Sequence, residues 1–161
     1  MSNRDARFAQ LMREHGAALG RVVASYARPA DQDDLAQEVS LGIWKALPAF
    51  RGDCSERTFV FRIAHNRGIS YLARKRLRGE ELPELVDGAP GPEAQAERRQ
   101  QSESLFRALR TLPVPFRQAL TLALEGMSNA EVGACLGITA ETAAVRLSRA
   151  RAALRAQLEE R

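Results

Sequence analysis

The residues from Ser128 to Arg151 constrain the fold of this chain more than any other stretch. Ser128 and Glu131 have the spacing of a capping box, in which a hydroxyl and a carboxylate bind free N–H groups at a helix start. Gly137 suits the left-handed position that ends a helix, and Thr139 suits the start of another. The segment therefore predicts two short helices joined by a tight turn.

The second of these helices has an apolar back and a small, polar and basic front. Positions three, four and seven apart share one face of a helix. The back consists of Ala143, Leu147, Ala150 and Leu154, and the front of Ala144, Ser148, Arg149, Arg151 and Arg155. Such a helix is typical of one that enters the major groove of DNA. An ordinary helical hairpin with a solvated arginine face would show the same pattern.

Composition and charge narrow the class of protein. The 161 residues suffice for one domain or two small ones, and the net charge of +4 suits a polyanionic partner. We expect a cytoplasmic protein without membrane insertion, because no apolar run is long enough to span a bilayer and the first residues are too polar for a signal peptide. The spacing of Cys54 and Cys135 leaves a single bridge open but favours reduced thiols. His15 and His65 lack ligand-spaced companions, so we expect no metal and no other cofactor.

The charges are segregated along the chain. Residues 62–78 contain arginine and lysine but no acid, whereas residues 79–97 contain acids, prolines and glycines but no base. The acidic stretch is typical of a linker. We therefore predict an all-α protein with two small helical domains, residues 1–78 and 98–161, joined by a flexible acidic linker over residues 79–97.

Helical periodicity predicts three helices in the first domain, over residues 5–26, 31–47 and 55–78, with Pro29 and Pro48 separating them. Each has an apolar stripe that should face a common core. The stripes consist of Phe8, Leu11, Met12, Leu19, Val22 and Val23 in the first helix, of Leu35, Val39 and Ile43 in the second, and of Phe61, Ala64, Gly68 and Leu72 in the third.

The helix over residues 31–47 has a second, acidic face that would suit a basic protein partner. Acids near a helix start also favour the helix dipole, so helix solubility explains the pattern equally simply. Trp44 is either a core residue or an interface anchor, and core is favoured because aromatic side chains are mostly buried. The other residues of this face are Asp34, Gln37, Glu38, Leu41 and Lys45.

The helix over residues 55–78 places aromatic side chains beside cations. Bases stack on aromatic rings while cations neutralise phosphates, so this combination suits single-stranded nucleic acid. The small polar side chains of Asn66 and Ser70 lie beside the basic stripe and are candidates for contacts to base edges. The alternative is that the aromatic rings are core and the cations are solvated. The stripe consists of Arg67, Tyr71, Arg74, Lys75 and Arg78.

Three stretches in this order resemble the extracytoplasmic-function (ECF) sigma factors of bacterial RNA polymerase. They are DDLAQEVSLGIWKALPAFRG, RTFVFRIAHNRGISYLARKR and ALRTLPVPFRQALTLALEGMSNAEVGACLGITAETAAVRLSRARAAL. The resemblance covers roughly Phe8 to Leu158 and implies that the two domains are sigma regions 2 and 4. It implies a protein that binds core RNA polymerase at its clamp and flap, recognises the −35 and −10 promoter elements, and supports promoter melting and transcription initiation.

The resemblance also implies roles for matching residues and a further partner. Double-stranded and single-stranded promoter DNA are both expected ligands, an anti-sigma factor is an expected partner, and the loop from Phe50 to Glu56 lies where the family helps to hold a flipped base. Polymerase contacts are implied for Asp34, Gln37, Glu38, Leu41 and Trp44, contacts to the −10 element for Asn66, Arg67, Ser70, Tyr71, Arg74 and Lys75, and contacts to the −35 element for Thr142, Ala144, Val145, Arg146, Ser148 and Arg149.

The chain departs from the family pattern in the second domain. Asn129 stands where the family usually has an aromatic residue, Ala144 where it has a cation, and Val145 where it has a small polar residue. Losing a cation removes a phosphate or guanine contact, and the apolar side chains suit thymine methyl groups. We therefore predict a weaker or more T-rich −35 preference than is usual in the family.

Two other functions compete with a sigma factor. A stand-alone dimeric helix-turn-helix regulator would explain the second domain, but not the single-strand-binding chemistry of the first. A nucleic-acid enzyme is disfavoured, because no nucleophile–base pair, carboxylate pair or phosphate-binding glycine loop has a credible spacing. We therefore expect no enzymatic activity.

Overall fold

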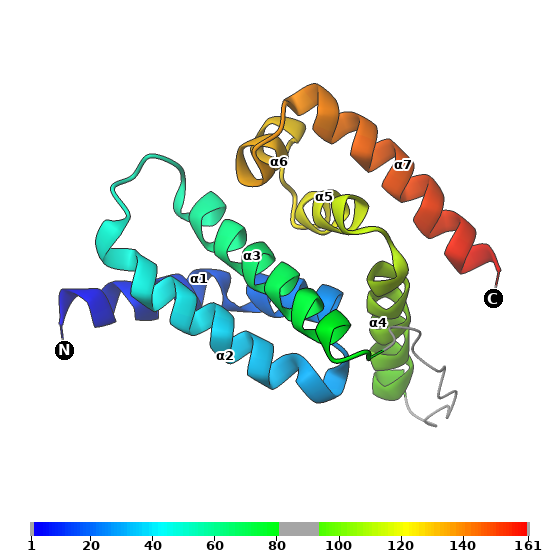
Figure 1. The fold of residues 1–161 in the computed structure, drawn as a ribbon, viewed down its shortest axis with the longest axis horizontal. Helices are drawn as coiled ribbons and strands as arrows, with labels where there is room; N and C mark the ends of the chain where they lie inside the picture. The colour runs from blue at the N-terminus through cyan, green and yellow to red at the C-terminus, as the bar shows by residue number, and fades with distance from the viewer. Residues whose placement is uncertain (1, 81–93, 161) are drawn as a thin grey trace.

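The computed structural model describes residues 2–80 and 94–160, and within these ranges the backbone is helical with no strand. The all-α prediction is therefore confirmed for the described residues. Most of the predicted linker, residues 81–93, lies outside them. The helices are α1 (Asn3–Tyr26), α2 (Pro29–Ala46), the short 3₁₀ helix η1 (Leu47–Ala49), α3 (Glu56–Leu77), α4 (Ala94–Thr111), α5 (Val114–Leu124), α6 (Asn129–Leu136) and α7 (Ala140–Glu159) (Figure 1).

Helices α1, α2 and α3 form the first bundle, and their predicted apolar stripes meet in its core. Phe8 and Met12 are partly buried at its edge, and the other predicted stripe residues are buried. Pro29 does not separate helices as predicted but begins α2, because a proline at the first helical position loses no hydrogen bond. Tyr26 lies against Gly68, where a Cβ would approach the tyrosine Cδ2 to 2.5 Å. Glycine at this position therefore lets α1 and α3 approach closely.

Helices α6 and α7 form the predicted helix-turn-helix. The hydroxyl of Ser128 accepts from the Glu131 backbone N–H at 3.2 Å, and the Glu131 carboxylate accepts from the Ser128 N–H at 3.1 Å. Gly137 has φ 71° and ends α6, and the hydroxyl of Thr139 caps α7. A Cβ on Gly133 would lie 2.5 Å from the backbone oxygen of Ile138, so the turn folds back tightly onto α6. Every capping prediction for this segment is confirmed.

Helix α7 buries the predicted apolar back against α5 and α6. Ala143, Leu147 and Ala150 are buried, and Leu154 is partly buried. The opposite face, with Ser148 and the arginines at 149, 151 and 155, is exposed. The helix is thus held from behind and its basic front is free.

The two helix groups pack against each other, which the sequence did not predict. Helix α3 contacts α6, while α1 contacts both α4 and α5 (Figure 1). Arg110 of α4 donates to the backbone oxygen of Ala24 at 2.7 Å, across the boundary between the groups. The hydrophobic core is continuous from one group to the other.

Candidate nucleic-acid interface

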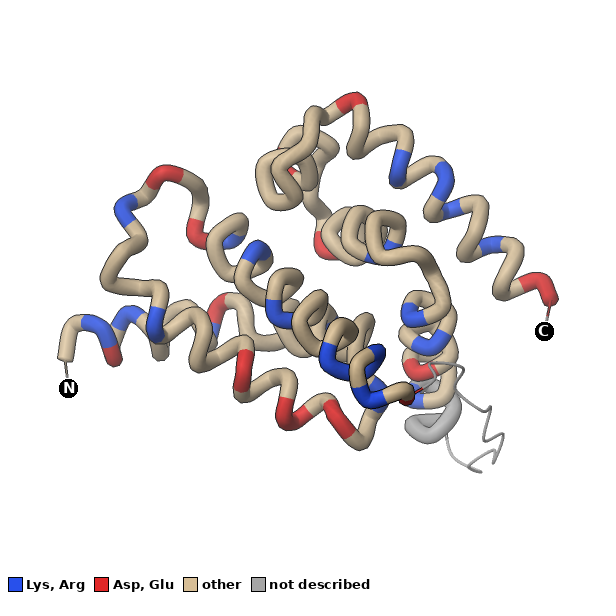
Figure 2. The backbone as a smooth tube through the Cα atoms, viewed as in Figure 1, with Lys and Arg blue, Asp and Glu red and all other residues tan. Residues whose placement is uncertain are grey.

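Helix α3 presents the most basic surface of the first bundle. Its N-terminus is fixed by the Ser55 hydroxyl, which accepts from the Thr58 N–H at 3.0 Å. Asn66 and Arg67 are exposed, and the half-buried Ser70 donates to the backbone oxygen of Asn66 at 3.2 Å. Figure 2 shows lysine and arginine positions along α3 and acidic positions along the neighbouring α2. These exposed polar residues can reach a nucleic acid without rearrangement of the helix.

The other predicted −10 residues face α2. The Tyr71 hydroxyl donates to Asp31 at 2.7 Å, and the Lys75 ammonium lies 2.8 Å from the same carboxylate. Arg74 donates to both carboxylate oxygens of Glu38 at 2.8 Å. Because Tyr71 is only 7% exposed, its ring is not open to a stacking base in this arrangement. These contacts could not be predicted from the sequence, since the partners lie on different helices.

The mutual contacts of Asp31, Tyr71 and Lys75 keep each of these groups in its usual protonation state near neutral pH. The ammonium of Lys75 and the hydroxyl of Tyr71 lower the pKa of Asp31, and that carboxylate and Glu80 raise the pKa of Lys75. Burial, followed by the bond to Asp31, raises the pKa of Tyr71 to about 12. Tyr71 thus remains a neutral donor between a carboxylate and an ammonium.

The loop between η1 and α3 is held by aromatic contacts. The ring of Phe50 stacks on that of Phe59 with centroids 4.4 Å apart, and the Arg7 guanidinium lies 5.2 Å from the Phe50 centroid. Phe61 is buried in the bundle core, as expected of a core aromatic. The loop also turns through Gly52, which has φ 83°. The contacts of Phe50 therefore hold the first residue of this loop against α3.

The acidic face of α2 is open, except at Trp44 and at Glu38, which Arg74 binds. Asp34 and Gln37 are exposed, and Leu41 keeps 51% of its surface exposed. Trp44 is half-buried under Arg4, whose guanidinium lies 3.4 Å from the ring centroid and donates to the Trp44 backbone oxygen at 2.7 Å. Trp44 is therefore not a fully buried core residue, and its role as an interface anchor stays a prediction.

The front of α7 contains the predicted −35 residues and faces solvent. The Thr142 backbone N–H donates to the Thr139 hydroxyl at 3.1 Å, so the cap fixes the first turn of the helix. Thr142, Val145, Ser148 and Arg149 are exposed, whereas Ala144 and Arg146 are half-buried. Figure 2 shows arginine positions repeated along this helix. A basic helix of this kind, held from behind by its own bundle, can insert into a major groove.

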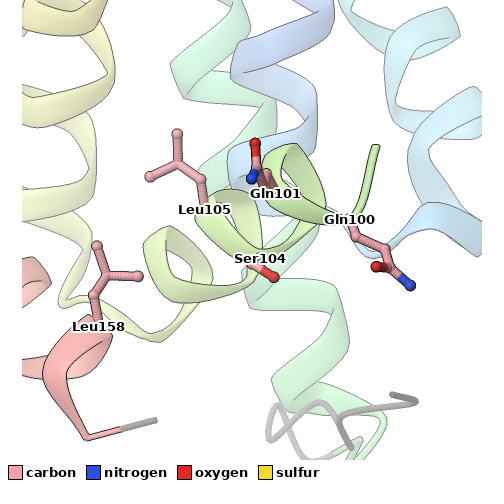
Figure 3. A pocket seen from close by; sticks show the side chains of 5 residues that line it. All are labelled: Gln100, Gln101, Ser104, Leu105 and Leu158. Atoms are coloured by element: carbon pink, nitrogen blue, oxygen red, sulfur yellow. The ribbon is translucent and has the colours of Figure 1, made fainter. Parts of the chain in front are cut away.

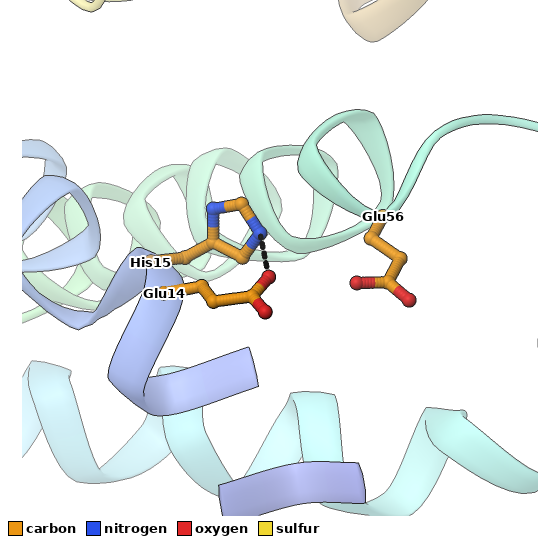
Figure 4. Close-up of side chains that lie close together, drawn as sticks. All are labelled: Glu14, His15 and Glu56. Carbon is orange, nitrogen blue, oxygen red and sulfur yellow. Dashed lines mark ion pairs between the residues drawn. The ribbon is translucent and has the colours of Figure 1, made fainter. Parts of the chain in front are cut away.

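One cluster of ligand-type side chains was not expected from the sequence. The ligand atoms of Glu14 and His15 in α1 and of Glu56 in α3 all lie within 4.8 Å of one another (Figure 4). An imidazole and carboxylates are donors for divalent transition metals. The 3.9 Å contact between His15 and Glu14 is also that of a simple ion pair. The expectation of no metal therefore stays a prediction.

Both cysteines are free thiols, as the sequence favoured. Cys54 is half-buried in the loop before α3, and Cys135 is buried in α6. Burial raises the pKa of Cys135 to about 11, so this thiol is rarely ionised at neutral pH.

A surface pocket lies between α4 and the end of α7. Its lining side chains, among the residues that the structure describes, are amides, a hydroxyl and aliphatic groups (Figure 3). They are Gln100, Gln101, Ser104, Leu105 and Leu158. In the described residues, no helix combines the length and hydropathy needed to cross a membrane.

Family models of known proteins match both helix groups of this chain. The family model "Sigma-70 region 2" matches residues 11–78, and "Sigma-70, region 4" matches residues 102–154. The chain is 32% identical to the RNA polymerase sigma factor NccH of Alcaligenes xylosoxydans xylosoxydans, over 94% of this chain and 87% of that protein. It is also 32% identical to the sigma factor CnrH of Cupriavidus metallidurans, over 98% and 90% of the two chains.

Solved structures give the same result. CnrH in complex with the cytosolic domain of CnrY is similar with a TM-score of 0.69 and 30% identity, covering 97% of this chain and 90% of that one. The sigma factor RpoE of Bartonella quintana, solved with the anti-sigma factor NepR, shares the fold with a TM-score of 0.67 at 20% identity, over 94% and 95% of the two chains. The chain therefore belongs to the ECF subfamily of the sigma-70 family, the subunits that direct bacterial RNA polymerase to promoters.

Proposed function

We propose that region 2 of this sigma factor contacts the −10 element through α3 and that region 4 contacts the −35 element through α7. The observation that carries this assignment is that α3 and α7 each present exposed polar and basic residues from a helix whose back is buried. On α3 these are Asn66 and Arg67, with the half-buried Ser70 beside them. On α7 they are Thr142, Ser148 and Arg149, with the exposed apolar Val145 and the half-buried Ala144 and Arg146 beside them.

Tyr71, Arg74 and Lys75 take a different part in this proposal. Their contacts to Asp31 and Glu38 fix α3 against α2, so they position the exposed residues of α3. They contact DNA directly only if those contacts are exchanged for contacts to phosphates.

The acidic face of α2 is the proposed docking surface for core RNA polymerase. Asp34, Gln37 and the exposed aliphatic side chain of Leu41 offer charge and apolar area together, with Glu38 and Trp44 at its edge. We assign promoter melting to the N-terminal domain, 1–78, and upstream recognition to the C-terminal domain, 98–161. The protein acts as a dissociable initiation subunit and not as an enzyme, and it works in the cytoplasm without a metal or other cofactor.

An anti-sigma factor is the proposed inhibitory partner. CnrH and RpoE, both similar to this chain, were solved with the proteins CnrY and NepR, and NepR is an anti-sigma factor. We infer that this chain is controlled in the same manner. The interaction would be tested with the full chain and candidate inhibitors from its own genome.

Reconstitution with bacterial core RNA polymerase tests the proposed function directly. Run-off transcription from a randomised promoter pool should enrich a two-part promoter, and Asn66→Ala and Arg149→Ala should each lose that enrichment. Arg13→Ala, which removes an exposed cation of α1 far from both surfaces in the sequence, is the matched control. Binding of the chain to duplex DNA as a dimer, with no binding to core polymerase, would instead indicate a stand-alone regulator.

A further inference from the structure

The solvent-facing side of α3 carries no exposed aromatic ring, although the sequence pattern suggested a surface for base stacking. The structure describes α3 in full, and the rings of Phe61, His65 and Tyr71 are buried. The ring of Phe59 is half-buried and stacks on that of Phe50, with centroids 4.4 Å apart. Bases of single-stranded nucleic acid stack on exposed rings. In this arrangement α3 therefore offers no ring to an unstacked base.

An exposed row of another kind follows α3 at spacings of three and four residues, which place side chains on one face of a helix. At its centre lies Ile69, an aliphatic residue that is 42% exposed. Arg62, at one end, also donates to the Ala134 backbone oxygen at 2.6 Å. No acid occurs in residues 57–78. We call this face the outer row, and it consists of Arg62, Asn66, Ile69, Ala73 and Arg76.

The side chains of the outer row match the chemical groups of the DNA major groove. An asparagine can bind adenine through two hydrogen bonds, an arginine can bind guanine or a phosphate, and an aliphatic side chain can contact the methyl group of thymine. Because isoleucine has neither a hydrogen-bonding group nor a ring, the thymine methyl is the base group that Ile69 can recognise.

Charge complementarity indicates which partner covers Ile69. Single exposed aliphatic residues are common on protein surfaces and need no partner. Ile69, however, lies between the amide of Asn66 and the cation of Arg76, on a helix side without acids. A polyanion with apolar groups between its phosphates fits this arrangement, and duplex DNA presents thymine methyl groups in that way.

The spacing along α3 fits neighbouring base pairs. Asn66 and Ile69 are three residues apart, or about 4.5 Å along the helix axis, and neighbouring base pairs are about 3.4 Å apart along the duplex. Ala73, one turn beyond Ile69, is too short to hold the helix away from the groove. Asn66 and Ile69 can therefore contact successive base pairs.

We propose that Ile69 contacts a thymine methyl group in the major groove of the −10 element, next to the base pair that Asn66 contacts. This inference rests on the proposed function, which places α3 on that element. It makes Ile69 a residue that determines promoter sequence, and it assigns the outer row to duplex DNA.

Replacing thymine with deoxyuridine tests the contact, because this exchange removes only the methyl group. The holoenzyme is bound to the promoter enriched from the random pool, with each thymine of the −10 element exchanged singly. At one position the wild type should bind about fourfold more weakly, the factor expected for one buried methyl group. Ile69→Ala should bind the thymine promoter more weakly and lose no further affinity with deoxyuridine. Ile69→Val keeps a branched side chain and should retain part of the discrimination.

Leu124→Ala is the matched control, because it removes an exposed aliphatic side chain from the end of α5. It should keep the full effect of deoxyuridine, and circular dichroism verifies that each variant is folded. A wild type that is insensitive to every exchange, a −10 element without thymine, or an Ile69→Ala variant with the full effect would overturn the proposal.

A premelted template distinguishes contact in the groove from contact with a single strand. Mismatches that open the sensitive position should abolish the methyl effect, whereas an effect of equal size on opened DNA would overturn the assignment to duplex DNA.

Failure of the proposed function would be seen separately, as absence of core binding and of promoter enrichment. The deoxyuridine exchange is then made in duplexes selected by the full chain alone. A methyl effect that is lost in Ile69→Ala would still support the contact to duplex DNA, and its absence would overturn that contact as well.

Discussion

Tyr71 of α3 donates a hydrogen bond to Asp31 of α2 at 2.7 Å, and the same carboxylate lies 2.8 Å from the ammonium of Lys75. The basic run of α3 is therefore partly neutralised by its neighbour before any nucleic acid arrives. Arg67, Arg76 and Arg78 remain exposed. These three arginines therefore offer more positive charge to DNA than Arg74 and Lys75, which are paired with acids of α2.

Removing the Tyr71 hydroxyl should weaken the fold while leaving its ring in place. Tyr71→Phe loses a hydrogen bond to a charged acceptor, and the free energy of unfolding should fall by about 1.5 kcal/mol. Urea denaturation followed by circular dichroism measures the change. Ser70→Ala removes a half-buried contact within the same helix and should cost less. A Tyr71→Phe midpoint equal to that of the wild type would contradict the structural role.

Stability should fall on mild acidification because His65 is buried and neutral. Burial lowers its pKa from 6.5 to about 3, so below pH 6.5 the unfolded chain takes up a proton that the native chain does not. This contribution is complete above pH 6.5 and is lost progressively as the pH falls toward 3. At pH 5 the loss amounts to about 2 kcal/mol, at 1.36 kcal/mol for each unit below 6.5. Denaturation at pH 7 and pH 5 measures it.

His65→Asn is the matched variant for this pH dependence. It should be less stable at pH 7, because it loses the contact between the ring and the Tyr26 hydroxyl at 2.7 Å. Its stability should nevertheless change less between pH 7 and pH 5 than that of the wild type. An identical change in both proteins would assign the pH dependence to other groups.

A methyl group on Gly133 should damage the helix-turn-helix, whereas one on Gly16 should not. The added Cβ at 133 would meet the Ile138 backbone oxygen at 2.5 Å, and the turn cannot move without shifting α7. We expect Gly133→Ala to lower stability by about 1–3 kcal/mol. No atom lies within 4 Å of a Cβ at Gly16, inside α1, so Gly16→Ala should raise stability by about 0.5–1 kcal/mol. Thermal unfolding compares the two, and equal effects would contradict the close approach.

An arginine at position 144 should strengthen recognition of the −35 element. Ala144 lies beside the exposed front of α7, so a longer side chain there can reach a phosphate or a guanine. Ala144→Arg should raise promoter affinity roughly tenfold and reduce the preference for T-rich sequence. Filter binding of the holoenzyme over a range of salt measures both. Ala156→Arg adds the same charge near the end of α7, and equal gains in both variants would indicate a general charge effect.

The sequence alone determined the three helices of the first bundle and the helix-turn-helix with its caps, and it determined which face of these helices is buried. These features depend on spacing and on residue chemistry within one helix, so Ser128, Glu131, Gly137 and Thr139 predicted the turn before α7 correctly. The same local patterns marked Asn66 and Arg149 as exposed candidates and Phe61 as core. The family followed from the order of the motifs.

Only the tertiary structure decided which charged and polar side chains are engaged in contacts with other helices. The sequence pattern placed Tyr71, Arg74 and Lys75 on a stripe suited to binding nucleic acid. In the structure they contact Asp31 and Glu38, which belong to another helix. The contacts of Arg21 with Glu125 and of Arg62 with Ala134 join residues of different bundles. Helical periodicity identifies a face but not what covers it, because the pairing of faces depends on how whole bundles pack together.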